Sequence, residues 1–475
     1  MIVSTDSRDM LDPSVIEVRV RGNEFHGLQI EDWTTGKPST QAARLARIGV
    51  TARESVVIND ADVTVPAQFS GLTVENVGIG DGLSPHPVDL GMHATHWHRC
   101  LPQGGANDGC YWAQIEQAAG VYSIAKLRTA LETAKARGCR TLWTTAYCPT
   151  IYASNLNVKR SSGFGTSRGW PSAPSDLAAT MQADPRDNSP VTRSFFTYVI
   201  TALGHLIDAI EFGNEILYRM ANSSSQPLAP IGNWYDSSDT WGGADYTTPR
   251  SSVVGDVQRY AQWVRWQACV YATVKAIRPE ILVLAPSFYG EVSSQSVGGK
   301  QDGETCFQQW MADGGADWCD GYSWHSYSEL YQKIDLGGVS YRLAKQLKSV
   351  QAARIAAGAP DKPWYCTEVG HEGLGYLPAG DQQRWADLLH AIHGALSFRH
   401  VIAYAWDGVN SSTDHMSWYL RAANPSKGLA AGLQPIAGRW NAAGARWAGK
   451  TISAGAVQLE DGRFCGRIDG VPRVI

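Results

Sequence analysis

Two glutamates in the sequence stand directly after runs of mainly apolar residues and have no cationic neighbour beside them. Glu215 ends the segment IEFGNE, and Glu368 ends the segment WYCTE. Two carboxylates that face one pocket can divide a reaction, because one stays ionised and attacks while the other stays protonated and donates a proton. The alternative is that each glutamate caps a helix or pairs with an arginine at a rim.

Other polar and aromatic side chains follow apolar runs in the same way. Histidine, tyrosine, asparagine and tryptophan are out of place inside a packed barrel, where Val, Ile and Leu are typical, but they suit the carboxyl ends of barrel strands, where sites lie. Besides the two glutamates, the candidates of this kind are His93, His96, Trp112, Tyr147, Asn214, His325, Tyr327 and Trp406.

The elements that must position these residues alternate along the chain. From about residue 88, short apolar runs alternate with segments that have apolar residues at helical spacing, which predicts βα units and a parallel sheet. The predicted strands are GMHATHW, CRTLWTTAY, IDAIEFGNE, EILVLAPS, DGYSWHSY, PWYCTEVG and HVIAYAWDG, with an eighth near DGCYWAQIE. We therefore expect an α/β fold, a (β/α)8 TIM barrel, over residues 88–430.

The two ends of the chain differ from this pattern. Residues 1–87 hold alternating segments such as VIEVRVRG and ESVVINDADVTVP, which predict a small β-rich N-terminal module. Residues 431–475 predict a C-terminal extension with a last helix and a β-hairpin at VQLEDGRFCGRIDG. Two long segments rich in Ser, Gly and Pro interrupt the barrel repeat and contain Trp170 and Trp234; loops of this length are typically functional or disordered.

Composition excludes several classes of protein. The chain of 475 residues has 41 Lys+Arg against 45 Asp+Glu, a net charge of −4, so we expect no nucleic-acid partner. No run of about 18 apolar residues predicts a membrane span, and the first residues do not have the pattern of a secretory signal. None of the nine cysteines forms a C-x-x-C motif, although Cys306 and Cys319 could form a local disulfide.

Six segments in order resemble clan A glycoside hydrolases, the retaining (β/α)8 enzymes, over residues 90–410. The chain looks most similar to family 39, the β-xylosidase and exopolysaccharide-hydrolase group, with family 5 next. The matching segments are WAQIEQAAGVYSIAKLRTALETAKARG, TTAYCPTIYAS, GNE, DGYSWHSY, WYCTEVG and YAWDG. The chain departs from the family at 213–216, where Gly-Asn-Glu-Ile replaces the usual Trp-Asn-Glu-Pro, and the family's second-strand arginine has only Arg99 as a candidate.

The resemblance implies a role for each matching residue. Glu215 would be the general acid and base, and Glu368 the nucleophile. Asn214 would hydrogen-bond the sugar 2-hydroxyl, and Tyr327 would orient Glu368. His325 would contact Glu215 or the sugar.

The resemblance also implies contacts with the substrate and a stereochemical outcome. Trp406 would form the apolar floor under the bound sugar ring. Independently of the resemblance, Trp170 and Trp234 lie in polar loops above the expected site, which predicts sugar-stacking platforms; the alternative is that they only anchor their loops. The configuration would be retained, with the carboxyl groups about 5–5.5 Å apart. No cofactor is implied. The two long aromatic-bearing loops predict several sugar subsites and therefore a polysaccharide substrate.

Two other functions are compatible with the sequence. A non-catalytic carbohydrate-binding protein, such as a virion tail or surface protein attached to a larger assembly through residues 1–87, would explain the unfamiliar N-terminal module and predicts an extracellular or virion-associated location. A metal-dependent barrel hydrolase would use the His93, His96 and His98 pattern, with Asp407 as a further ligand. The milder interpretation of His93 and His96 is sugar binding.

Overall fold

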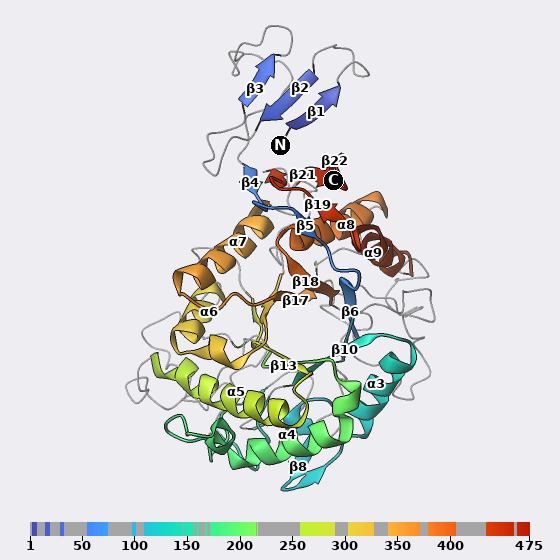
Figure 1. The fold of residues 1–475 in the computed structure, drawn as a ribbon. Coiled ribbons are helices and arrows are strands. Elements are labelled where there is room, and N and C mark those ends of the chain that lie inside the picture. The colour runs from blue at the N-terminus through green and yellow to red at the C-terminus, as the bar shows by residue number, and fades with distance from the viewer. Residues whose placement is uncertain are drawn as a thin grey trace.

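The repeated apolar runs form the parallel strands of one barrel in the computed structural model (Figure 1). The structure describes residues 2–6, 15–19, 29–32, 55–74, 97–100, 109–145, 147–154, 156, 159–160, 167–168, 172–214, 216, 257–289, 303–326, 341–370, 379–404, 434–459 and 463–475. Within these ranges the barrel strands are β6 (Ser70–Val74), β7 (Trp97–Cys100), β10 (Arg140–Thr145), β13 (Ala209–Phe212), β14 (Leu282–Leu284) with β15 (Phe288–Tyr289), β16 (Tyr322–His325), β17 (Trp364–Val369) and β18 (Phe398–Ala403). Neighbouring strands pair in parallel in chain order, and β18 pairs with β6. The predicted (β/α)8 barrel is confirmed.

One barrel strand is interrupted. β14 pairs with β13 while β15 pairs with β16, so residues 282–289 cross the barrel as one strand with a break between Leu284 and Phe288. A parallel bridge from Leu284 to Gly321 continues the ring across the break. Pro286 lies in the break and has no backbone N–H to give to a ladder, which explains why regular pairing stops there.

Helices join successive barrel strands and cover the outside of the ring (Figure 1). Helix α4 shows how the sequence sets their bounds: Ser189 accepts a hydrogen bond from the backbone N–H of Thr192, and Pro190 takes the first helical position. The inward face of α4 buries apolar side chains completely, and Trp263 and Trp266 of α5 are equally buried. The helices are α2 (Trp112–Ile115), α3 (Ala125–Ala136), α4 (Pro190–Leu203), α5 (Val257–Ile277), α6 (Gly303–Ala312), α7 (Tyr341–Ala356), α8 (Ala379–Ala395) and α9 (Gln434–Trp447). No helix within the described ranges is long and apolar enough to cross a membrane.

The barrel begins earlier and ends later than the sequence predicts. Its first strand is β6 at residues 70–74, inside the segment 1–87 that we expected to be a separate module. The predicted first strand, GMHATHW, overlaps the second barrel strand β7, and the predicted strand near DGCYWAQIE is the helix α2. Helix α9, expected in the extension from 431, packs on α8, and Trp440 donates to the carbonyl of Gly71 at 3.0 Å.

Two smaller sheets accompany the barrel. β1 (Ile2–Asp6), β2 (Val15–Arg19) and β3 (Gln29–Asp32) form an antiparallel sheet of their own. The predicted C-terminal hairpin is confirmed as β20 (Val457–Leu459) and β21 (Phe464–Ile468). This hairpin belongs to a sheet with β19 (Thr451–Ile452), β22 (Val471–Val474), β4 (Ser55–Val57) and β5 (Val63–Thr64). The sheet therefore combines strands that precede the barrel in the chain with strands that follow it.

Two short antiparallel ladders lie elsewhere in the chain. β8 (Glu116–Ala118) pairs with β9 (Val121–Tyr122), and β11 (Lys159–Arg160) pairs with β12 (Ser167–Arg168).

The inside of the barrel has an apolar layer below a polar layer. A cluster of apolar side chains, including Trp97, Leu142 and Ala209, fills the part nearer the amino ends of the strands. Side chains alternate along a strand, so the inward positions two residues further on form the next layer. That layer is polar: Arg99 follows Trp97, Thr144 follows Leu142, Glu211 follows Ala209, and Thr367 follows Tyr365.

All nine cysteines are buried, and none of them forms a disulfide. The disulfide considered between Cys306 and Cys319 is not formed, and the Cys319 thiol donates to the carbonyl of Ala316 at 3.6 Å.

Candidate active site

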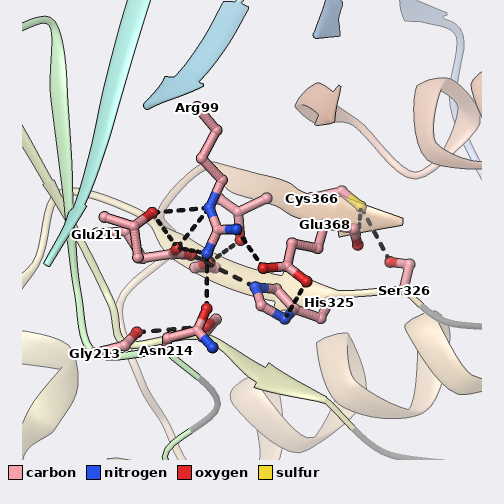
Figure 2. Close-up of polar contacts among 12 residues, drawn as sticks. Arg99, Glu211, Gly213, Asn214, His325, Ser326, Cys366 and Glu368 are labelled. Carbon is pink, nitrogen blue, oxygen red and sulfur yellow. Dashed lines mark hydrogen bonds and ion pairs between the residues drawn. The ribbon is translucent and has the colours of Figure 1, made fainter. Parts of the chain in front are cut away.

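Arg99 stands at the centre of the polar layer and is completely buried (Figure 2). Its Nη1 donates to Oε1 of Glu368. Its Nη2 donates to Glu211 Oε2 at 2.9 Å and to Asn214 Oδ1 at 2.7 Å. Its Nε donates to Thr144 Oγ1 at 2.8 Å and to Glu211 Oε2 at 3.2 Å. One guanidinium therefore joins β7, β10, the end of β13 and the end of β17.

The two carboxylates that Arg99 contacts differ in their access to solvent. The Glu211 side chain is fully enclosed, whereas that of Glu368 keeps 7% of its surface exposed. Glu211 also accepts from the hydroxyls of Thr144 at 2.9 Å and of Ser323. Of this pair, Glu368 is the one that a molecule entering from the carboxyl ends of the strands can reach.

The charges in this layer stabilise one another. Burial alone would raise the pKa of Glu211, but Arg99, His325 and the hydroxyls of Ser323 and Thr367 lower it below its ordinary value. Burial would likewise lower the pKa of Arg99, yet the neighbouring Glu368 and Glu211 raise it above its ordinary value. Arg99 and Glu211 are therefore an ionised pair, and the cation is permanent at any pH at which the protein is folded.

His325 lies beside both carboxylates. Its Nδ1 is 3.5 Å from Glu368 Oε2, and its Nε2 is 4.0 Å from Glu211 Oε1. The register of β16 against β17 shifts between Trp324 and His325, so His325 pairs with Glu368 itself. The sequence predicted a contact of His325 with Glu215 or the sugar; the described structure places it against the predicted nucleophile.

The backbone that carries Glu368 is held from outside the barrel (Figure 2). The N–H of Ser326 donates to the carbonyl of Glu368 at 2.9 Å, and the Cys366 thiol donates to Ser326 Oγ at 3.4 Å. His393 of α8 lies 2.9 Å from the same hydroxyl, and burial lowers the pKa of His393 to about 4. A neutral imidazole on Ser326 fixes the strand end without adding charge next to Glu368.

Gly213 lies where the family pattern has tryptophan, and the structure explains the difference. Gly213 adopts φ +106°, a backbone conformation that side-chain-bearing residues avoid. A Cβ at this position would lie 2.5 Å from the indole of Trp263, which fills the space beside it. The turn that presents Asn214 to Arg99 therefore depends on glycine.

Replacing Gly213 by alanine should destabilise the protein by about 2–4 kcal/mol, because it adds both a clash with Trp263 and backbone strain. Urea unfolding followed by tryptophan fluorescence measures this loss. Gly358→Ala is the matched control: Gly358 also has a positive φ, +64°, but nothing lies within 4 Å of its added Cβ, so only the smaller strain cost applies. Equal losses in both variants would show that Trp263 does not restrict the turn.

Two of the predicted substrate-binding aromatics have packing roles in the structure. Trp112 is 1% exposed; its indole N–H donates to Glu116 at 2.7 Å, and its ring stacks on Phe195. The expected strand is instead the helix α2, and Trp112 packs against Phe195 of α4 and Trp266 of α5. Tyr147, at the end of β10, is also buried, and its ring packs edge-on against Tyr111.

Several predicted residues lie outside the described ranges, and their roles stay predictions. They are Glu215, Tyr327, Trp406, His93, His96, Trp170 and Trp234.

Sequence reasoning missed Glu211, Thr144, Ser323 and Thr367. Glu211 stands in the run AIEF, where a carboxylate between apolar neighbours is the signal in the sequence, but that signal does not say which way the side chain points. Arg99, by contrast, was proposed as the counterpart of the family's arginine, and it does lie beside Glu368.

The metal hypothesis gains no support within the described ranges, where no group of three or more His, Cys, Asp or Glu side chains could hold an ion. His98 alternates with Arg99 on β7 and faces outward, with Nε2 3.3 Å from the Cys139 thiol.

The fold and this cluster define a class: a (β/α)8 barrel with an arginine–carboxylate site at the carboxyl ends of its strands.

No protein-family model and no curated protein sequence matches the chain. Among solved structures it is similar to a family 39 glycoside hydrolase from the gut symbiont Bacteroides cellulosilyticus WH2, with 13% identity, a TM-score of 0.49 and coverage of 97% of this chain and 75% of that one. A glucosidase from Croceicoccus marinus has 12% identity, a TM-score of 0.48 and coverage of 87% and 74%. Xylanase 10B from Thermotoga maritima has 11% identity, a TM-score of 0.44 and coverage of 80% and 95%. These identities are too low to transfer a substrate.

Proposed function

We propose that this protein is a retaining β-glycoside hydrolase that cleaves a polysaccharide with Glu368 as nucleophile and Glu215 as acid and base. The observation that carries the proposal is the guanidinium of Arg99, which contacts Glu368 and Asn214 at the same time. Asn214 immediately precedes Glu215 in the chain. A reaction that uses two carboxylates needs both strand ends to face one pocket, and this contact supports such an arrangement.

The geometry around Glu368 suits nucleophilic attack. A carboxylate is the form that pairs with a cation, and it is also the form that can bond to carbon. Glu368 contacts the charge of Arg99, and 7% of its side-chain surface stays exposed. Glu211 is enclosed by its hydrogen-bond donors and has no exposed side-chain surface, which argues against Glu211 as the attacking group.

The reaction would take two steps. The carboxylate of Glu368 bonds to the anomeric carbon as the glycosidic C–O bond breaks, and the proton of Glu215 passes to the departing oxygen. Water then bonds to the same carbon, Glu215 takes a proton from that water, and the ester bond to Glu368 breaks. The sugar leaves with its original configuration, and both glutamates return to their starting forms.

Asn214 is oriented for a contact with the substrate. Because its Oδ1 accepts from Arg99, the amide is fixed with Nδ2 as the donor. A donor beside the nucleophile fits the sugar 2-hydroxyl, whose hydrogen bond strengthens in the transition state.

Replacing Glu215 by alanine should lower turnover by about 10²–10⁴-fold, because the leaving oxygen then departs without a proton. On an aryl glycoside with a good leaving group, added azide should restore part of the rate and give a glycosyl azide of retained configuration. Chromatography of the products measures this. An inverted azide product would instead indicate that Glu215 is the nucleophile.

Reducing-end release over a panel of plant and bacterial polysaccharides tests the proposed function. Release by the wild-type protein, with product of retained configuration by NMR, supports it. Binding of a glycan without release would instead favour the non-catalytic carbohydrate-binding function, and the extracellular or virion-associated location stays a prediction in either case.

A further inference from the structure

Glu211 is a buried carboxylate that the proposed reaction does not use. It accepts from Arg99 through Nε and Nη2, and its other partners come from separate strands: Thr144 of β10, Ser323 of β16 and Thr367 of β17. A carboxylate held by donors from so many strands cannot shift without disturbing the barrel itself.

A guanidinium offers a carboxylate two parallel pairs of donors, Nη1 with Nη2 at its end and Nε with Nη2 along its side. Glu211 occupies the side pair, since both Nε and Nη2 donate to its Oε2. Glu368 is consequently left with Nη1 alone, and Nη2 also reaches Asn214 at 2.7 Å. Among the described residues, Glu211 is the other carboxylate that pairs with Arg99, so its loss would favour the stronger two-bond pairing of Arg99 with Glu368.

We propose that Glu211 is a positioning residue, which holds Arg99 so that one terminal nitrogen serves Glu368 and the other serves Asn214. Glu368 thereby keeps a fixed orientation without being covered by a two-bond ion pair. The placement of Arg99 follows from geometry alone, whereas its effect on turnover rests on the proposed function.

Glu211→Gln tests the positioning directly. The amide can turn its oxygen to Arg99 and its nitrogen to the hydroxyls of Ser323 and Thr367, so the packing around position 211 is retained. A neutral oxygen attracts the guanidinium less strongly than a carboxylate does, so Arg99 is no longer held in place. Crystal structures of the wild-type protein and the variant should show Arg99 swung onto both oxygens of Glu368, with its bond to Asn214 broken. An unmoved guanidinium would overturn the proposal, whether or not the protein hydrolyses any polysaccharide.

The effect on turnover has its own signature. On a polysaccharide that the wild-type protein cleaves, kcat of Glu211→Gln should fall about 10²-fold with little change in KM. The charged and titratable groups of this layer are Arg99 of β7, Glu211 of β13, His325 of β16, Glu368 of β17 and His400 of β18. The Tyr111 hydroxyl lies near Arg99, and the neutral His393 lies behind Ser326. Removing one negative charge from this group should move the pH–rate profile to lower pH by about 0.5–1 unit. If the pH–rate profile of Glu211→Gln has a lower maximum rate but an unchanged position on the pH axis, Glu211 has only a structural role.

Two more variants complete the design. Glu211→Asp keeps the negative charge but shortens the side chain by one methylene. The pH–rate profile should therefore stay in place, while Arg99 should withdraw from Asn214. If Glu211→Gln does not fold, the crystal structure of Glu211→Asp tests the positioning instead. Glu116→Gln is the matched control, since Glu116 is equally buried but bonds Trp112 and Tyr152 rather than an arginine. It should change stability and leave the pH–rate profile unmoved; a shift equal to that of Glu211→Gln would overturn the inference.

Discussion

Replacement of Glu368 by glutamine should abolish polysaccharide hydrolysis and leave the protein folded. The amide oxygen can still accept from Arg99, so the local packing is preserved, but an amide cannot form the ester that the proposed mechanism requires. We expect a loss of about 10⁴-fold or more in kcat. Reducing-end release on the best polysaccharide substrate measures it, with the wild-type protein beside the variant.

The control for this prediction is an exposed carboxylate. Glu132 lies on α3 with 53% of its side chain exposed and only a surface ion pair to Arg128, so Glu132→Gln should keep full activity. Near-UV circular dichroism should give the same spectrum for both variants and the wild type. Full activity of Glu368→Gln would remove Glu368 from the mechanism, and with it the assignment of a retaining glycosidase.

Replacement of Arg99 by methionine should destabilise the fold more than any surface change. Methionine fills much of the same volume but leaves Glu211 and Glu368 without their shared cation. Breaking a buried ion pair by removing one partner typically costs about 3–5 kcal/mol, because the remaining charge stays buried and uncompensated. Urea unfolding at pH 7 measures the loss, and Arg128→Met, at an exposed position on α3, should change the free energy of unfolding by less than about 1 kcal/mol.

The pH dependence of this loss should have a definite sign. In the wild-type protein the pKa of Glu211 lies below its ordinary value of 4.5, so the stabilisation that Glu211 gives is present above that pH and is lost on further acidification. In Arg99→Met burial dominates and raises the pKa of Glu211 above 4.5, so protonation on acidification relieves the destabilisation. The difference in unfolding free energy between the two proteins should therefore narrow from pH 7 toward pH 4. A constant difference would show that Arg99 acts by packing alone.

Local patterns were enough to predict most of the barrel. An apolar run or a helical spacing is set by residues that are close together in the chain. The run CRTLWTTAY forms strand β10, and the helical spacing of residues 257–277 forms helix α5. The same patterns led to Glu368, Asn214 and His325 as site candidates, because a polar side chain after an apolar run is visible in the sequence itself.

The partners of those residues were beyond the reach of local patterns. The inward direction of Glu211 depends on which face of β13 turns to the barrel axis, and a single carboxylate in AIEF does not reveal that face. Trp112 was misplaced for a related reason, since a short helix and a short strand have similar apolar content.

The sequence by itself determined the class of fold, the order of its strands from β10 onward, and the chemical types gathered at the strand ends. Only the tertiary structure decided where the barrel closes, which it does by pairing Ser70 of β6 with Val401 of β18. It also decided that Arg99 lies between Glu368 and Glu211. The physical reason is that hydrophobic periodicity is a property of neighbouring residues, whereas strand pairing and a buried ion pair depend on which distant segments meet in space.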